Sequence, residues 1–127
     1  MRRLLIIIIT MIVIIVSMSI LSYYYISSVS GNMLDSLNDL QKNIKNESWE
    51  KARNSYSDVE KDWNKVQKYF PLLIAHSNLH ELNMSITKIS ALLKIEEKKE
   101  IIPELEVAKK ITGEISEEEK LSLRNIF

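Results

Sequence analysis

Both histidines of the chain lie in the stretch HSNLHEL, residues 76–82, where His76 and His80 are four positions apart. On an α-helix, two histidines at this spacing share one face and can bind zinc together. Zinc proteases of this pattern carry a glutamate between the histidines as general base, and no acidic residue stands between them here. Glu81 would point about 100° away from His80 around the helix, a poor direction for sharing its metal. We therefore interpret His76 as a polar contact beside a helix–helix seam, with a metal site as the weaker alternative.

The composition offers little else for catalysis. The chain has no cysteine, which excludes a thiolate nucleophile, a disulfide framework and a cysteine-based zinc site. No glycine-rich phosphate loop, serine–histidine–aspartate set or paired catalytic carboxylates can be singled out. Seventeen basic residues balance seventeen acidic ones, so the chain lacks the basic surplus with which nucleic-acid binders meet phosphates. We expect no enzyme, no cofactor and no nucleic-acid partner.

Large aromatic residues recur every seven positions in the middle of the chain. Trp49, Tyr56, Trp63 and Phe70 form one ladder, which is interleaved with a second ladder of Ala and Val residues. Alternating steps of three and four are typical of a bundle or coiled-coil seam. The ladder predicts core packing of large rings, with an apolar ligand pocket between helices as the alternative. The predicted bundle core comprises Trp49, Tyr56, Trp63, Phe70, Leu79, Leu82, Ile86 and Ile89.

The elements that position these residues begin with a predicted membrane anchor. From Leu4 to Leu21 there is no charged residue. A helix extended to Tyr25 would be roughly 33 Å long, enough to cross a hydrocarbon core of ~30 Å. The alternative is a cleaved signal peptide, because Ser28-Val29-Ser30 before Gly31 offers a small-x-small cleavage site. We favour the anchor, since the apolar run exceeds the roughly 7–15 residues of a typical signal-peptide core.

The residues that flank the apolar run predict its direction in the cell membrane. Arg2 and Arg3 precede it and would keep the N-terminus in the cytoplasm. Tyr23, Tyr24 and Tyr25 follow it, where an aromatic belt would meet the outer headgroups. The sequence therefore predicts a single-pass protein whose C-terminal domain is extracytoplasmic.

Two regions are expected, an anchor with short flanks over residues 1–30 and a helical-bundle domain over residues 31–127. Ser30, Gly31 and Asn32 are expected to break the chain between them, and the alternative is an anchor helix that continues into the first outer helix. Apolar residues at helical spacing predict a first outer helix over residues 33–70, in which the apolar phase slips around residues 45–48. Pro71 would end or kink this helix.

Two further long helices are predicted over residues 72–94 and 97–115. Pro103 conflicts with the last of them and would either kink it or mark its first turn. Ser116 and Glu119 match a capping box, which predicts a short final helix after Gly113. No repeat of 20–50 residues is visible in the sequence.

The predicted fold is therefore all-α: one N-terminal transmembrane helix, then an antiparallel bundle of three long helices plus a short C-terminal helix. About 97 residues can bury only a modest core. We expect membrane lipid as one partner and another membrane or envelope protein, or a second copy of the chain, as the other. The leading interpretation is an interaction or accessory protein. The alternative is a ligand- or metal-sensing bundle that uses the space near Trp63 and His76.

The order and spacing of several motifs also resemble a known family. These are the basic start and apolar span, "DVEKDWNKVQKYF" with Trp63, His76 followed by "LHELNMSITKISALL", and a close in "LSLRNIF". The chain resembles an uncharacterised family of small single-pass membrane-anchored helical proteins of Firmicutes, classed as a domain of unknown function. The resemblance covers nearly the whole chain and implies an extracytoplasmic helical domain that could serve as an accessory subunit beside multi-pass membrane proteins.

Overall fold

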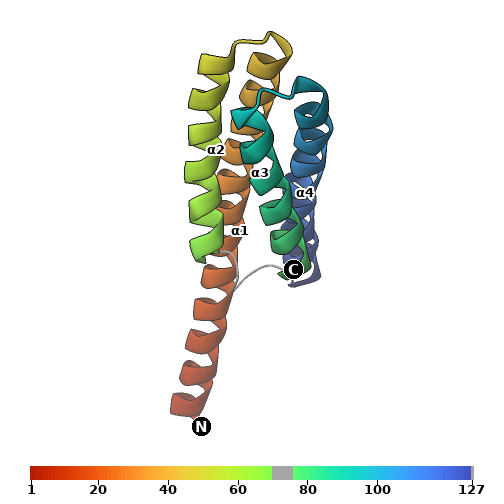
Figure 1. Cartoon of the computed structure of the whole chain (residues 1–127). Helices are drawn as coiled ribbons and strands as arrows, with labels where there is room; N and C mark the ends of the chain where they lie inside the picture. The colour runs from red at the N-terminus through yellow and green to blue at the C-terminus, as the bar shows by residue number, and fades with distance from the viewer. Residues whose placement is uncertain (70–75, 127) are drawn as a thin grey trace.

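The computed structural model describes the backbone of residues 1–69 and 76–126, and the side chains of residues 1–68, 77–115 and 117. Every regular element in this part of the chain is an α-helix (Figure 1). The predicted all-α class, with a long apolar N-terminal helix leading into a helical bundle, is confirmed. The helices are α1 (Arg2–Lys45), α2 (Trp49–Tyr69), α3 (His76–Lys94) and α4 (Lys98–Ile126).

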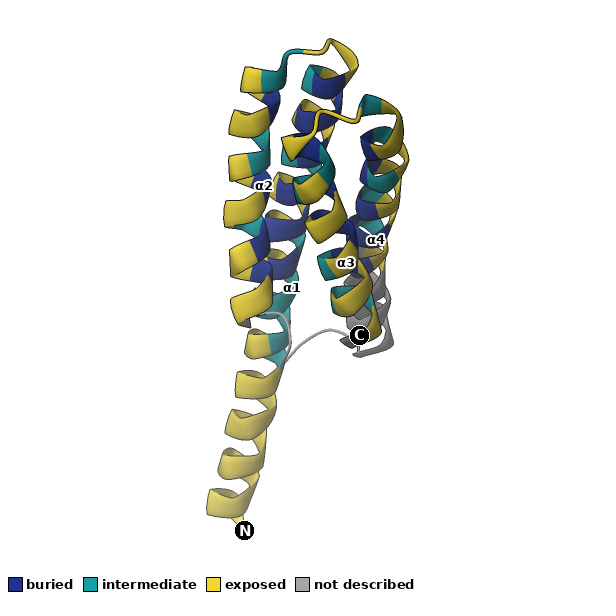
Figure 2. Ribbon diagram, in the orientation of Figure 1, coloured by how far each residue is buried: buried dark blue, intermediate teal, exposed yellow. Residues whose placement is uncertain are grey.

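The four helices pack unequally around one core. Helix α1 packs against α2 and α4, α3 packs against α4, and α2 and α3 touch only marginally. The first half of α1 projects beyond the other helices and is exposed on all sides (Figure 2). The core is an inward stripe on each helix, as 3.6-residue periodicity requires. Its most deeply buried side chains include Ile26, Met33, Leu37, Leu40, Ile44, Val59, Leu82, Ile89, Ile101, Leu105 and Ile115.

Helix α1 is one continuous helix of 44 residues, so the predicted break at residues 30–32 is wrong. A glycine inside a helix is destabilising by roughly 0.5–1 kcal/mol relative to alanine, which is too little to end it here. Val29, Ser30 and Met33 are buried against the bundle, and their packing stabilises the helix across Gly31. Tertiary contacts therefore override the local breaker signal.

The predicted helix over residues 33–70 is two helices, because the phase slip at residues 45–48 is a complete reversal of the chain. Glu47 has a left-handed φ of 55°. The Ser48 N–H donates to the Asn43 carbonyl at 2.9 Å, and the Glu47 N–H donates to the Ile44 carbonyl at 3.0 Å. These two bonds form a Schellman motif, which satisfies the last carbonyls of α1 and turns the chain into α2.

The turn between α3 and α4 repeats this geometry. Glu96 has a φ of 56°, the Glu97 N–H donates to the Leu92 carbonyl at 3.2 Å, and the Glu96 N–H donates to the Leu93 carbonyl at 3.3 Å. Both reversals lie at the end of the bundle far from the N-terminus (Figure 1).

Ion pairs link the two turns crosswise. Lys98 of α4 lies 3.7 Å from the Glu47 carboxylate and donates to the Lys45 carbonyl at 2.9 Å. Arg53 of α2 lies 2.7 Å from the Glu96 carboxylate. Each left-handed glutamate is therefore paired with a cation from the other helical hairpin.

Replacing the left-handed glutamate of the first turn should stabilise the protein. A non-glycine residue in this conformation costs about 1–2 kcal/mol, whereas the exposed Glu47–Lys98 pair contributes about 0–1 kcal/mol. We expect Glu47→Gly to raise the free energy of unfolding of the full chain in detergent by about 0.5–1 kcal/mol. Chemical denaturation checks this result. Lys61→Gly, inside α2, is the control and should lower the same quantity; a loss of stability in Glu47→Gly would contradict the argument.

Helix α4 extends without a break to Ile126, so the prediction of a separate short C-terminal helix after Gly113 is wrong. Gly113 lies inside α4, and the buried residues Ile111, Thr112 and Ile115 continue the inward stripe across it. Pro103 lies within the helix and not in its first turn. Because proline has no N–H, the helix lacks the hydrogen bond that residue 103 would otherwise donate to the carbonyl four residues earlier.

The two helical hairpins, α1–α2 and α3–α4, are structurally equivalent at an offset of 49 residues, although no repeat is visible in the sequence. From Met33 to Val66, every buried residue except Gln41 has a buried residue 49 positions later. The left-handed residues Glu47 and Glu96 obey the same offset. The matching buried pairs are Met33 and Leu82, Leu37 and Ile86, Leu40 and Ile89, Ile44 and Leu93, Ala52 and Ile101, Val59 and Ala108, Trp63 and Thr112, and Val66 and Ile115.

Candidate functional site

The first half of α1 is the most conspicuous functional feature. It is long and apolar enough to cross a membrane, although a signal sequence would meet the same criterion. Its side chains are exposed to the surroundings of the protein, for example Ile9 and Ile12. The Thr10 hydroxyl donates to the Ile6 carbonyl at 2.8 Å and the Ser19 hydroxyl donates to the Ile15 carbonyl at 3.0 Å. These polar groups are therefore satisfied within the helix, as a lipid environment requires.

The residues that were predicted to flank the membrane lie at the two ends of this exposed segment. Arg2 and Arg3 are exposed at its start, and Tyr24 and Tyr25 are exposed at its end, with Tyr23 half-buried. The rings of Tyr23 and Tyr24 meet edge to face with centroids 5.5 Å apart.

The bundle begins immediately after the tyrosines. Ile26 is fully buried, and Val29 and Ser30 are buried as well. The small-x-small sequence that could be a cleavage site therefore lies inside the folded bundle. Cleavage after Ser30 would remove three buried side chains from the core.

A polar clasp, in which Gln41 is buried and Glu106 is exposed, joins α1 to α4. The Gln41 amide donates to the Glu106 carboxylate at 2.5 Å, and Lys109 donates to the Gln41 amide oxygen at 2.8 Å. Lys109 also lies 3.6 Å from the Glu106 carboxylate. The hydrogen bond from Gln41, followed by the positive charge of Lys109, lowers the pKa of Glu106 below its usual range.

The clasp predicts an acid-sensitive part of the stability. Because the pKa of Glu106 is lowered in the folded state, its contribution is fully present above the ordinary glutamate value of roughly 4.3 and is lost as the pH falls through the folded pKa. We expect the free energy of unfolding to fall on acidification, and Glu106→Gln to remove part of this pH dependence. Chemical denaturation at several pH values measures the pH dependence of the free energy of unfolding. Glu114→Gln, elsewhere in α4, is the control; an equal change in both variants would contradict the assignment.

The seam between α2 and α3 has different residues at the positions equivalent to the clasp, and it contains a groove. At the 49-residue offset, Gln41 corresponds to Ser90 and Lys109 corresponds to Glu60. These shorter side chains line a groove of about 380 Å³, together with Tyr56 and other residues of both helices. The groove lies where α2 and α3 touch only marginally.

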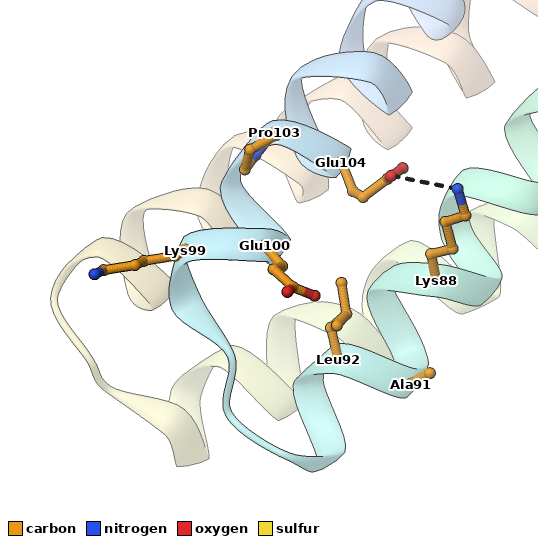
Figure 3. Close-up of a pocket in the computed structure, with 7 residues that line it drawn as sticks. All are labelled: Lys88, Ala91, Leu92, Lys99, Glu100, Pro103 and Glu104. Atoms are coloured by element: carbon orange, nitrogen blue, oxygen red, sulfur yellow. Dashed lines mark ion pairs between the residues drawn. The ribbon is translucent and has the colours of Figure 1, made fainter.

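The outer side of α3 and α4 contains a larger groove, of about 520 Å³ (Figure 3). Lys88 of α3 crosses its edge to Glu104 of α4, at 3.7 Å, and the Ser85 hydroxyl donates to the Glu104 carbonyl at 3.0 Å. The lining residues are Lys88, Ala91, Leu92, Lys99, Glu100, Pro103 and Glu104.

At the corresponding place on the first hairpin, hydrogen bonds join α1 to α2. The Asn43 amide donates to the Ser55 hydroxyl at 2.7 Å and to the Lys51 carbonyl at 3.4 Å. At the 49-residue offset, Leu92 replaces Asn43 and Glu104 replaces Ser55. The leucine cannot make these bonds, so the second hairpin retains an open groove with a partly apolar lining.

The structure describes the side chain of only one of the two histidines. His80 is exposed on α3, and the side chain of His76 lies outside the described residues. Among the described residues, no group of three or more His, Cys, Asp or Glu side chains could hold a metal ion.

The predicted core residues fall into two groups. Trp63, Leu82, Ile86 and Ile89 are buried, whereas Phe70 lies outside the described residues. Three others pack against the core while remaining partly exposed: Trp49, Tyr56 and Leu79. The aromatic ladder thus contributes one deeply buried ring, Trp63, and one ring that lines the α2–α3 groove, Tyr56. A pocket between helices at the aromatic ladder was the alternative prediction, and the α2–α3 groove lies beside Tyr56 of this ladder. The α3–α4 groove was not predicted, and residue types that differ at the 49-residue offset are the signal that could have found it.

The fold and these features define a helical-bundle protein with a candidate N-terminal membrane helix. Residues 20–126 match the family model of DUF4363, a domain of unknown function, and the chain belongs to this family. The match begins inside α1, ahead of its first buried residue, Ile26. Comparisons with curated proteins and with solved structures found no match.

Proposed function

We propose that the protein is a single-pass, membrane-anchored helical bundle that docks onto another membrane or envelope protein as an accessory subunit. In this proposal α1 remains uncleaved, its N-terminus is cytoplasmic, and the bundle stands outside the cytoplasm. Arg2 and Arg3 at the start of α1 support this orientation.

The observation that carries the proposal is the continuity of α1. One half of this helix is apolar and exposed, and the other half supplies core residues from Ile26 to Ile44. No flexible linker separates the anchor from the bundle, so the bundle is held at a fixed height and orientation above the bilayer. Such preorganisation favours docking, because less freedom is lost when a partner binds.

Topology is the first test. A reporter fused after Phe127 should lie on the opposite side of the membrane from Met1, and the mature protein should retain residues 1–30 by mass spectrometry. A reporter on the same side as Met1 would contradict the proposed topology, and loss of residues 1–30 would contradict the retained anchor.

Docking is tested by crosslinking in native membranes followed by purification in detergent. The full chain should be recovered with a second protein. A variant with a short Gly-Ser linker inserted between Tyr25 and Ile26 keeps the anchor and the buried residues but uncouples their orientation, and it should give less of the same product. Recovery of this chain only, alone or crosslinked to itself, would contradict docking onto another protein.

The second candidate function is ligand sensing by the bundle, and the α2–α3 groove favours it. The groove combines a ring and an aliphatic side chain, Tyr56 and Leu93, with the charged residues Arg53, Glu60 and Lys94. Interhelical space of this kind can take a small amphipathic ligand. A ligand that binds only the folded state raises the melting temperature. Thermal unfolding with a metabolite library tests the sensing of a small molecule, and thermal unfolding with zinc or a chelator tests the sensing of a metal. Tyr56→Ala should abolish a shift in melting temperature that is due to this groove.

A further inference from the structure

Among the described residues of the bundle, the exposed large apolar side chains lie on the second hairpin. Beyond Tyr25, the exposed large apolar residues of the described chain are Met84, Ile95 and Val107. Their counterparts 49 positions earlier are Asp35, Asn46 and Asp58, which are polar and exposed. The same fold position is therefore polar on one hairpin and apolar on the other.

Two of these residues extend the α3–α4 groove into a continuous face. Met84 is on the same side of α3 as Lys88 and Ala91, which follow at intervals of four and three residues. Val107 is on the same side of α4 as Pro103, four residues before it. We call the surface formed by Met84, Lys88, Ala91, Leu92, Lys99, Glu100, Pro103, Glu104 and Val107 the α3–α4 face.

The anchor restricts how a second copy could meet this face. Because α1 is continuous, all copies inserted in one membrane hold their bundle axes in the same direction. Two-fold symmetric dimers are the commonest assemblies, and here the two-fold axis must run along the bundle axis. Residues at one height on the first copy then face residues at the same height on the second.

The charges of the α3–α4 face match this symmetry. Lys88 and Glu104 lie at one height, since their charged atoms are 3.7 Å apart. Lys99 and Glu100 are neighbours in sequence and lie at a second height, about one turn from Glu104. Figure 3 shows Glu100 directed toward the groove and Lys99 directed away from it, so the symmetric pairing rests on the first level. Rotation by 180° about an axis between Lys88 and Glu104 brings the Lys88 of each copy to the Glu104 of the other.

We propose that the α3–α4 face is a homodimer interface, in which Met84 and Val107 supply apolar contacts and Lys88 and Glu104 form charge pairs between the copies at its rim. The proposal rests on the membrane anchoring described above. Confinement to one membrane in one orientation raises the effective concentration of the two faces, so a modest apolar surface is sufficient for association.

Single cysteines test the interface, because the chain has none of its own. In native membranes containing the full chain, oxidation should convert most of Val107→Cys and Met84→Cys into covalent dimers. Asp58→Cys and Asp35→Cys, the counterparts on the first hairpin, are matched controls and should remain monomers. Equal dimer formation by the controls would indicate random collision and would overturn the proposal.

The rim charges give an independent test on the Val107→Cys background. Lys88→Glu alone and Glu104→Lys alone should each reduce the dimer, because each places like charges at the same height. Co-expression of the two variants should restore dimers, now between unlike copies. No change in either single variant would overturn the proposed register.

Labelling with a membrane-impermeant maleimide separates this inference from the proposed function. If Val107→Cys is labelled from outside but forms no dimer, the interface is wrong and the topology stands. If it is labelled only after the membrane is permeabilised, the proposed topology is wrong. If it crosslinks only to a chain of different mass, another protein occupies the face and the homodimer is wrong.

Discussion

Leu40→Ala is expected to destabilise the full chain by about 2–5 kcal/mol, the range for a leucine removed from a packed core. Leu40 is fully buried on the inward stripe of α1, so the smaller side chain would leave a cavity. The free energy of unfolding of a typical domain is about 5–15 kcal/mol, so this loss would remove a substantial part of it. Denaturation of the full chain in detergent measures it.

The same helix supplies the control. Leu5→Ala, in the exposed half of α1, should change the free energy of unfolding of the bundle by less than about 0.5 kcal/mol, since Leu5 is 59% exposed. Ile89, the counterpart of Leu40 at the 49-residue offset, should respond like Leu40 when replaced by alanine. A strong effect of Leu5→Ala in detergent, or none of Leu40→Ala, would contradict the division of α1 into an exposed and a buried half.

The second large effect concerns insertion into the membrane. Fifteen aliphatic or methionine residues between Leu4 and Leu21 favour insertion by about 5–9 kcal/mol in total, and each arginine near the centre opposes it by about 2.5–3.5 kcal/mol. The triple variant Ile8→Arg, Ile12→Arg and Ile15→Arg should therefore be lost from the carbonate-resistant membrane fraction.

A matched variant places three arginines on exposed sites of the bundle. Asn38→Arg, Ser57→Arg and Asn64→Arg add the same charge outside the apolar segment and should leave the protein in the membrane fraction. If the variant with arginines in α1 stayed fully membrane-integrated, the exposed half of α1 would not be the segment that holds the protein there.

Much of the fold was predictable, because strong and repeated signals specify it. The uncharged run after Arg3 predicted the long exposed helix, and apolar residues at steps of three and four predicted the inward stripes. The errors occurred where tertiary packing overrides local propensity. Gly31 and Gly113 read as helix breakers, yet both lie inside helices whose neighbouring residues are buried.

The turn after α1 could not be located from residue type alone. Glycine and asparagine are the usual signals for a left-handed residue, and Glu47 occupies that position here. Its counterpart in the second hairpin is also a glutamate, Glu96. Only the slip in the apolar phase indicated that something changes, and a slip does not distinguish a reversal from a kink.

The candidate site was less predictable than the fold. The sequence drew attention to His76 and His80, whereas the grooves arise from differences between equivalent positions, such as Asn43 and Leu92. Few residues are identical between the two hairpins, so their relation becomes apparent only when burial and turn geometry are compared. No single sequence motif therefore reveals the equivalence of the two hairpins or the grooves that follow from it.

The continuity of α1 has a mechanical consequence. From Ile26 to Lys45 the helix extends about 30 Å beyond the end of its exposed half, at 1.5 Å per residue. If the exposed half of α1 spans a bilayer as proposed, leaning it by ~10°, well inside the spread seen for spanning helices, would move the far turns sideways by ~5 Å. Bilayer thickness would in this way be converted into the lateral position of Glu47 and Glu96, so the protein would act as a stiff lever whose reach depends on the lipid around it.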